Sequence, residues 1–167
     1  YRKAFNIINT SECIYHIAEC YSLLEKYEEA IIEYSKLYSL IDFGFHHHVF
    51  LGCLFEAVGS LDKAIQSFDN SIKCLNQSTE CLDELNILSR NRNIVITYYL
   101  RGCAKLKKRM YKDAIEDFNA TINLDNEFSL SYFGRGKCYQ ELGNLEHAIA
   151  DISLAIKLNP NNELAHS

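Results

Sequence analysis

The chain has 167 residues, of which 48% are hydrophobic and 23% charged, and its formal net charge is −5. This composition can supply a buried core, which excludes an intrinsically disordered chain. The acidic balance argues against a general nucleic-acid-binding protein, because such a protein needs a basic face. No apolar run approaches the roughly 20 residues that span a bilayer, and the first residues lack the apolar stretch of a signal peptide, so we expect no membrane insertion.

A short pattern recurs along the whole chain: a small residue is followed twelve positions later by Ala-Ile. The small residue and the alanine are Ala18 with Ala30, Gly52 with Ala64, Gly102 with Ala114, and Gly136 with Ala148. The alanines are 34 residues apart within each half of the chain and 50 apart across the middle. A fixed period of this size is typical of a stacked-repeat protein.

In chain order, the period predicts a single array over residues 1–167. Residues 1–10 look like the end of a second helix from a preceding repeat. Four repeats follow, at 11–44, 45–78, 95–128 and 129–162, with an insertion or helix extension at 79–94. Residues 163–167 look like the start of a following first helix, so we expect a fragment of a longer array.

The last repeat shows the expected structure of one unit most clearly. Tyr132, Gly136 and Tyr139 are 4 and 3 residues apart, which places them on one face of a first helix. A break at Gly143-Asn144 ends that helix. A second amphipathic helix follows, with Leu145, Ala148, Ile149, Ile152, Ala155 and Ile156 spaced by 3 and 4, and Pro160 closes the unit. The small residues Gly136 and Ala148 let the two helix axes approach closely where they cross.

These residues resemble the tetratricopeptide repeat (TPR) pattern of aromatic, glycine, aromatic, alanine, aromatic, alanine and proline. The last repeat supplies Tyr132, Gly136, Tyr139, Ala148, Ile152, Ala155 and Pro160. The third departs at Lys105 and Asn126, and the second has His48 in the first aromatic place. The resemblance implies an all-α fold, an α-α superhelix that forms a solenoid of antiparallel helix hairpins. It also implies a non-catalytic protein–protein interaction scaffold.

The sixteen extra residues between the second and third repeats contain no Gly or Pro. Their apolar residues Cys81, Leu82, Leu85 and Leu88 have helical rather than loop-like spacing. We therefore expect the second helix of repeat two and the first helix of repeat three each to be longer by about two turns. A plain ordered loop is the alternative.

The resemblance places the binding surface on the first helix of each repeat, which lines a concave groove. The predicted partner-binding groove contains Tyr15, Glu19, Val49, Cys53, Tyr99, Cys103, Phe133 and Lys137. Exposed aromatics in a concave surface are typical anchors for a bound protein or peptide segment. The alternative is that some of these side chains face a neighbouring repeat and belong to the core; groove and core are equally compatible with Tyr99 and Phe133, and Val49 fits the groove less well.

The same comparison excludes one ligand class. Chaperone-binding TPR domains grip a C-terminal carboxylate with lysines, asparagines and an arginine. The corresponding places hold Tyr15, Glu19, Phe50, Ile96 and Leu100 here, or residues without a suitable charge one repeat later. We therefore predict a partner other than chaperone C-terminal tails. The rival functions are a recognition arm of a larger enzyme and a self-association module, which light scattering against concentration separates from groove binding.

Other chemical signals are weaker. His46-His47-His48 cannot converge on one ion if helical, because adjacent side chains point about 100° apart. The seven cysteines show no C-x-x-C pair, and their repeat-matched places predict small packing residues in a reducing, cytoplasmic or nuclear compartment. We expect no catalytic, cofactor or metal site. The basic cluster Lys105, Lys107, Lys108, Arg109 and Lys112 predicts either a solvated turn or a site for an acidic partner.

Two arginines occupy places where the repeat expects an apolar residue. Arg101 and Arg135 are each followed 16 positions later by an aspartate, Asp117 or Asp151, on the paired helix. We predict an Arg–Asp ion pair across each of these two hairpins. A partly exposed pair would contribute at most about 1 kcal/mol.

Overall fold

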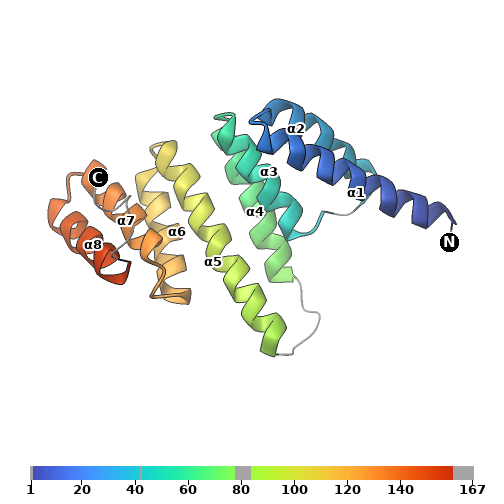
Figure 1. The fold of residues 1–167 in the computed structure, drawn as a ribbon. Helices are drawn as coiled ribbons and strands as arrows, with labels where there is room; N and C mark the ends of the chain where they lie inside the picture. Colours follow the sequence, from blue (N-terminus) through green and yellow to red (C-terminus); the bar gives the residue numbers. More distant parts are fainter. Residues whose placement is uncertain (1, 42, 78–83, 160–167) are drawn as a thin grey trace. The chain divides into compact units, whose positions relative to one another are not determined.

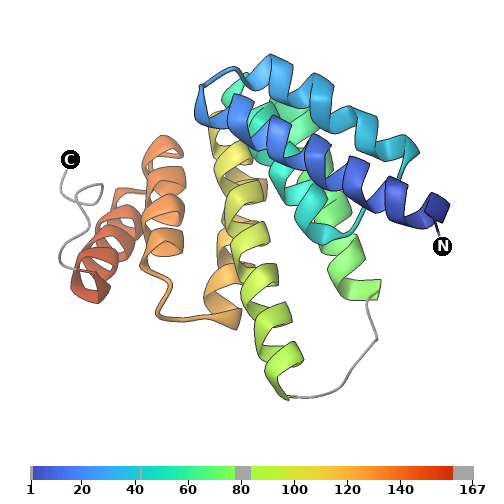
Figure 2. The same cartoon turned by 45° about the vertical axis from the view of Figure 1, so that its right-hand side comes forward.

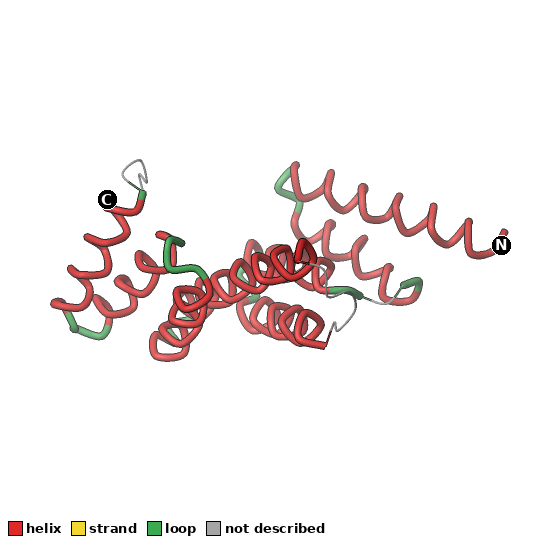
Figure 3. The backbone as a smooth tube through the Cα atoms, turned by 90° about the horizontal axis from the view of Figure 1, so that it is seen from below, coloured by secondary structure: helices red, strands yellow, loops and turns green. Residues whose placement is uncertain are grey.

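The computed structural model describes residues 2–41, 43–77 and 84–159, and within them the regular structure is entirely helical (Figure 1). The all-α fold class predicted from the sequence is therefore confirmed. The chain divides into two compact units, an N-terminal unit of residues 1–74 and a C-terminal unit of residues 75–167. Each unit is built from helix hairpins, and short turns join the paired helices (Figure 3).

The N-terminal unit contains α1 (Arg2–Leu23), α2 (Tyr27–Ser35), the short 3-10 helix η1 (Lys36–Ser39), α3 (Phe45–Ala57) and most of α4 (Leu61–Gln77). Helix α2 packs against both α1 and α3. α1 is continuous from Arg2, whereas the sequence predicted the end of a separate helix before residue 11. The difference has a simple reason: no Gly or Pro interrupts this segment, so nothing ends a helix there.

The C-terminal unit contains α5 (Glu84–Lys107), α6 (Tyr111–Leu124), α7 (Ser129–Glu141) and α8 (Leu145–Leu158). α5 packs on α6, α6 on α7, and α7 on α8. The predicted opening of a further helix at 163–167 lies outside the described residues, as does Pro160.

The extra residues between repeats two and three lengthen mainly one helix. α5 has 24 residues, whereas the first helices α3 and α7 have 13 each, and α4 has 17. The sequence predicted about two extra turns in each helix; within the described residues, which exclude 78–83, α5 gains more than this, and α4, at 17 residues against 14 in α6 and α8, gains less. Figure 2 shows α5 running past the end of α6. Arg90 Nε donates to the carbonyl of Leu75 at 2.8 Å, which satisfies one of the last carbonyls of α4.

The recurring small residues lie where the helices cross, as predicted. The alanines at 18, 30, 64, 114 and 148 are all buried. A Cβ added at Gly136 would lie 2.8 Å from Ile152 Cγ1 and 3.3 Å from the Ala148 carbonyl oxygen. Gly52 has the same relation to the ring of Phe68. A side chain at these glycines would therefore push the paired helices apart.

Phe118 links two neighbouring hairpins of the C-terminal unit. Its ring is fully buried, and a Cβ added at Gly102 or at Gly134 would lie 2.9 Å or 2.5 Å from it. The ring therefore lies against glycines of both α5 and α7. Cys138 and Ala114 complete the buried cluster around it.

Candidate functional site

The first helices α1, α3, α5 and α7 carry the eight residues that the sequence assigns to a groove. In the N-terminal unit, Tyr15 is half-buried and packs against core rings, with its ring centroid 5.9 Å from Tyr34 and 5.8 Å from Phe50. Glu19 is half-exposed, and its Oε2 lies 3.0 Å from His16 Nδ1. Burial and the hydrogen bond to Glu19 raise the pKa of Tyr15. Tyr15 is thus a packing residue of the core as well as a partly exposed residue of the predicted groove.

Val49 and Cys53 follow on α3, and both are half-buried. Burial, with a smaller effect of Glu56, raises the pKa of the Cys53 thiol to about 11. Cys53 therefore stays protonated at neutral pH and is a poor nucleophile. It can contribute shape and apolar contact to a surface, but not reactive thiolate chemistry.

In the C-terminal unit, Tyr99 and Cys103 of α5 face the packed interior. The ring centroid of Tyr99 is 5.2 Å from that of Phe128 and 6.1 Å from that of Phe118. Cys103 packs on the same buried cluster, which contains Cys138. Burial, together with Cys103, raises the pKa of Cys138 to about 12. Of the two alternatives weighed for Tyr99, these contacts favour core.

Phe133 and Lys137 lie together on α7, where they line an open depression of about 510 Å³. Lys137 Nζ lies 5.3 Å above the Phe133 ring, within cation–π range. The end of α5 and the following turn contribute Leu106, Lys107 and Arg109. Tyr111 and Glu141 complete the lining, and the Tyr111 hydroxyl donates to Glu141 Oε2 at 3.0 Å. In the C-terminal unit, this depression is where predicted groove residues meet on an accessible surface.

The basic cluster at the α5–α6 turn has two different roles. Lys105 turns inward, where its Nζ pairs with Asp117 Oδ2 at 2.8 Å. Lys107 and Arg109 line the depression beside Phe133, whereas Lys108 and Lys112 are exposed. The cluster is therefore neither a simple solvated turn nor a single basic patch.

Both predicted Arg–Asp ion pairs are confirmed, and each is bidentate. Arg101 donates from Nε to Asp117 Oδ2 at 2.9 Å and from Nη2 to Oδ1 at 2.5 Å. Arg135 donates from Nε and Nη2 to the Asp151 oxygens at 2.7 Å and 2.8 Å, and these bonds raise its pKa against the opposing effect of burial. Its Nη1 also donates to Asn119 Oδ1 at 2.6 Å, which ties α7 to α6.

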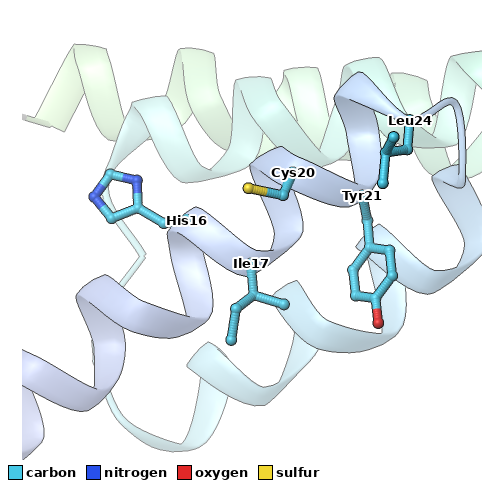
Figure 4. A pocket seen from close by; sticks show the side chains of 5 residues that line it. All are labelled: His16, Ile17, Cys20, Tyr21 and Leu24. Atoms are coloured by element: carbon cyan, nitrogen blue, oxygen red, sulfur yellow. The ribbon is translucent and has the colours of Figure 1, made fainter.

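Sequence reasoning missed an apolar surface on α1. His16, Ile17, Cys20, Tyr21 and Leu24 line a shallow pocket on this helix and the residue after it (Figure 4). Ile17 is 45% exposed and Leu24 is 65% exposed. Residues 17, 20, 21 and 24 are largely apolar and have helical spacing, so the sequence does indicate this apolar helix face. It is a different face of the helix from the one that carries Tyr15 and Glu19.

The lengthened part of α5 forms a second unpredicted depression. Leu88, Arg92, Val95 and Ile96 of α5 line it, together with Leu124 and Phe128 from the end of α6 and the following loop. Val95, Ile96, Leu124 and Phe128 belong to the predicted third repeat, whereas Leu88 and Arg92 lie in the extra segment, which has no counterpart in the other repeats.

The three consecutive histidines pack against aromatic rings near the start of α3. The His47 ring stacks on Phe43 with centroids 5.0 Å apart, and His46 lies 3.9 Å from His47. Burial, with smaller effects of His46 and His48, lowers the pKa of His47 to about 4. Burial also lowers the pKa values of His46 and His48. These histidines are thus neutral at pH 7.

We expect the N-terminal unit to lose stability as the pH falls from about 6.5 towards 4. The unfolded chain takes up a proton on His47 near its ordinary pKa, whereas the folded chain resists protonation until about pH 4. The unfolded state therefore binds more protons in this window and is favoured by acid. Thermal unfolding of wild type and His47→Phe at pH 7, 6 and 5 measures the effect, since the variant keeps an aromatic ring beside Phe43. Equal falls in melting temperature for both proteins would contradict the prediction.

Within residues 2–41, 43–77 and 84–159, no cluster of three or more His, Cys, Asp or Glu side chains is arranged to hold a metal ion. In the same described part of the chain, no helix is both long and apolar enough to cross a membrane. Its six described cysteines are free thiols, of which Cys138 is buried whereas Cys13 and Cys20 are exposed. The prediction that repeat-matched cysteines are packing residues thus holds for Cys138 and not for its counterpart Cys20.

Comparison with known proteins identifies the class. Tetratricopeptide-repeat profiles match residues 11–42, 95–128 and 129–162, which together cover more than half of the chain. The chain therefore belongs to the tetratricopeptide repeat family.

The individual proteins that match this chain share low sequence identity with it or match it over only part of their length. A small glutamine-rich tetratricopeptide repeat-containing protein of Dictyostelium discoideum is 35% identical over 66 residues, which are 40% of this chain and 20% of the relative. The structure of YrrB, a TPR protein with an unusual peptide-binding site, is similar with a TM-score of 0.75 at 18% identity, over 93% of this chain and 72% of YrrB. The first TPR of Spaghetti (RPAP3), bound to the HSP90 peptide SRMEEVD, has a TM-score of 0.59 at 21% identity, over 73% and 84%.

Proposed function

We propose that this chain is a non-catalytic scaffold that holds a segment of a partner protein against the first helices of its repeats. The observation that carries the proposal is the depression where Phe133 and Lys137 lie beside Leu106 and the α5–α6 turn. Aromatic side chains are enriched in protein–protein interfaces, and Lys137 adds a positive charge beside the Phe133 ring. The fold supports the same conclusion, because TPR proteins such as the one bound to SRMEEVD hold peptides.

The eight assigned groove residues have unequal roles in this proposal. Phe133 and Lys137 make the direct contacts in the C-terminal unit, while Tyr99 and Cys103 hold α5 in place behind them. In the N-terminal unit, Glu19, Val49 and Cys53 are the contact residues, and Tyr15 is mainly a packing residue. The raised pKa values of Cys53 and Cys138 accord with a role without thiolate chemistry.

A peptide-display selection on the full chain tests the proposal. Peptides that bind the wild type should bind Phe133→Ala about tenfold or more weakly, since loss of a central aromatic anchor costs more than about 1 kcal/mol. Ile149→Ala is the matched control, because Ile149 is 68% exposed but lies on the second helix α8 of the same repeat. The proposal fails if the selected peptides are insensitive to Phe133→Ala or lose equal affinity with Ile149→Ala.

The proposed scaffold differs from a carboxylate-clamp cochaperone. The clamp places on α1, α3 and α5 hold Tyr15, Glu19, Phe50, Ile96 and Leu100, which offer neither a cation nor an amide to a carboxylate. We expect the C-terminal carboxylate of the peptide SRMEEVD to contribute nothing to binding, so isothermal titration calorimetry should give the same affinity for the free-acid and C-terminally amidated peptides. Micromolar binding that is lost when the C-terminus is amidated would contradict this prediction.

A further inference from the structure

The turn after each first helix holds one residue with positive φ. Gly59 and Gly143 have φ of 75° and 76°, while Arg109 has φ of 65° and Glu25 has φ of 59°. The hydrogen bonds are the same in kind: Arg109 N–H donates to the Leu106 carbonyl at 2.9 Å, as Gly143 N–H does to Gln140 at 3.0 Å. The four turns therefore share one helix-ending geometry, which favours glycine because a Cβ crowds the left-handed backbone.

Arg109 thus occupies a position that a glycine would fill with less strain, as it does in two sister turns. Residues held in such conformations concentrate at functional sites, where the surrounding structure maintains them. Arg109 also lines the depression beside Phe133. Glu25 has the same backbone conformation in the N-terminal unit, so the conformation alone assigns Arg109 no role; the position of the Arg109 side chain in the depression is what points to this surface.

The charge of this surface is opposite to that of the chain as a whole. Lys107, Arg109 and Lys137 line the depression with one carboxylate, Glu141, whose Oε2 accepts a hydrogen bond from Tyr111. The chain has a net charge of −5, so this basic patch is local. Leu106 and Phe133 supply apolar area within the same depression. Such a surface complements a ligand with carboxylates on either side of an apolar side chain.

We propose that this depression binds an acidic peptide segment that carries an apolar side chain, and that Arg109 is retained in the strained turn to contact a carboxylate of that segment. The proposal rests on the scaffold function proposed above and specifies the chemistry of its partner. The apolar side chain packs on Phe133 and Leu106, and the flanking carboxylates face Arg109, Lys107 and Lys137.

The variant Arg109→Gly tests this proposal, because it should raise the stability of the protein and weaken its binding of the peptide. Glycine relieves the positive-φ strain, so the melting temperature should rise by about 2–4 °C. Removal of the guanidinium should weaken binding of a labelled, end-capped peptide with one phenylalanine between glutamates by about three- to fivefold, measured by fluorescence anisotropy on the full chain. Glu25→Gly is the matched control: it relieves the same strain in the N-terminal unit and should leave peptide affinity unchanged.

The charge class is tested with a second peptide in which glutamines replace the glutamates. Weaker binding of the glutamine peptide, and a smaller difference between the two peptides at high salt, support the proposal. Equal binding of both peptides that still depends on Phe133 overturns the acidic class but leaves the scaffold function standing. Oligouridylate that binds more tightly than the acidic peptide and depends on Arg109 overturns the peptide class. An Arg109→Gly protein that is less stable than wild type overturns the strain argument.

Discussion

Replacement of Phe118 by alanine is expected to lower the free energy of unfolding of the C-terminal unit by about 3–5 kcal/mol. The Phe118 ring is fully buried and lies against Gly102 of α5 and Gly134 of α7. Because both neighbours lack side chains, little can move in to fill the space that the ring leaves. The variant thus loses the transfer free energy of the ring and also gains a cavity between two hairpins. Urea unfolding followed by circular dichroism measures the loss.

Leu124→Ala is the control for Phe118→Ala. Leu124 lies on the same helix α6 but is 51% exposed, so its removal should change stability by less than about 0.5 kcal/mol. A Phe118→Ala loss no larger than that of the control would contradict the role of Phe118 as the link between hairpins.

Removal of the Asp117 carboxylate should destabilise the C-terminal unit by about 3 kcal/mol, because it leaves two mostly buried cations without their shared partner. The Asp117 side chain is 3% exposed, and it pairs with Arg101, which is 17% exposed, and with Lys105, which is 14% exposed. The net contribution of the intact group is smaller than this cost, since desolvation offsets most of the attraction. Urea unfolding of Asp117→Ala against wild type measures the loss.

Asp151→Ala gives the comparison that makes this prediction specific. Asp151 neutralises one arginine rather than two cations, and Arg135 keeps its hydrogen bond to Asn119. We therefore expect a smaller loss from Asp151→Ala than from Asp117→Ala. Replacement of Arg101, Lys105 and Asp117 together by apolar residues should recover most of the stability. A larger loss for Asp151→Ala, or no recovery in the triple variant, would contradict the explanation.

The sequence predicts the hairpins well because their crossings depend on residue size at fixed spacing. Gly136 against Ala148 and Ile152 illustrates this: only a small residue fits, so the period of the small residues reports the contact directly. The Arg–Asp pairs were predictable for the same reason. Residues 16 positions apart meet at the same place in each hairpin, so opposite charges there imply an ion pair.

The features that the period does not specify were predicted poorly. The extra residues lengthen α5 mainly, and the repeat offers no comparison for a segment that occurs once. Tyr99 and Phe133 hold matching places, yet Tyr99 packs on Phe128 and Phe118 whereas Phe133 lines an open depression. Their difference depends on which neighbours surround each helix. The positive φ of Arg109 also needed the structure, since glycine at the sister turns gives no sign that arginine keeps the same geometry.

The central claim is that a partner segment binds at the depression formed by α7 and the α5–α6 turn. Chemical-shift mapping tests it most directly, by titration of a selected peptide into the ¹⁵N-labelled full chain. We predict that the largest amide shifts fall at Leu106, Arg109, Phe133 and Lys137, with little change at Ile149 on α8. The largest shifts on α6 or α8, with none at Phe133 and Lys137, would contradict the claim.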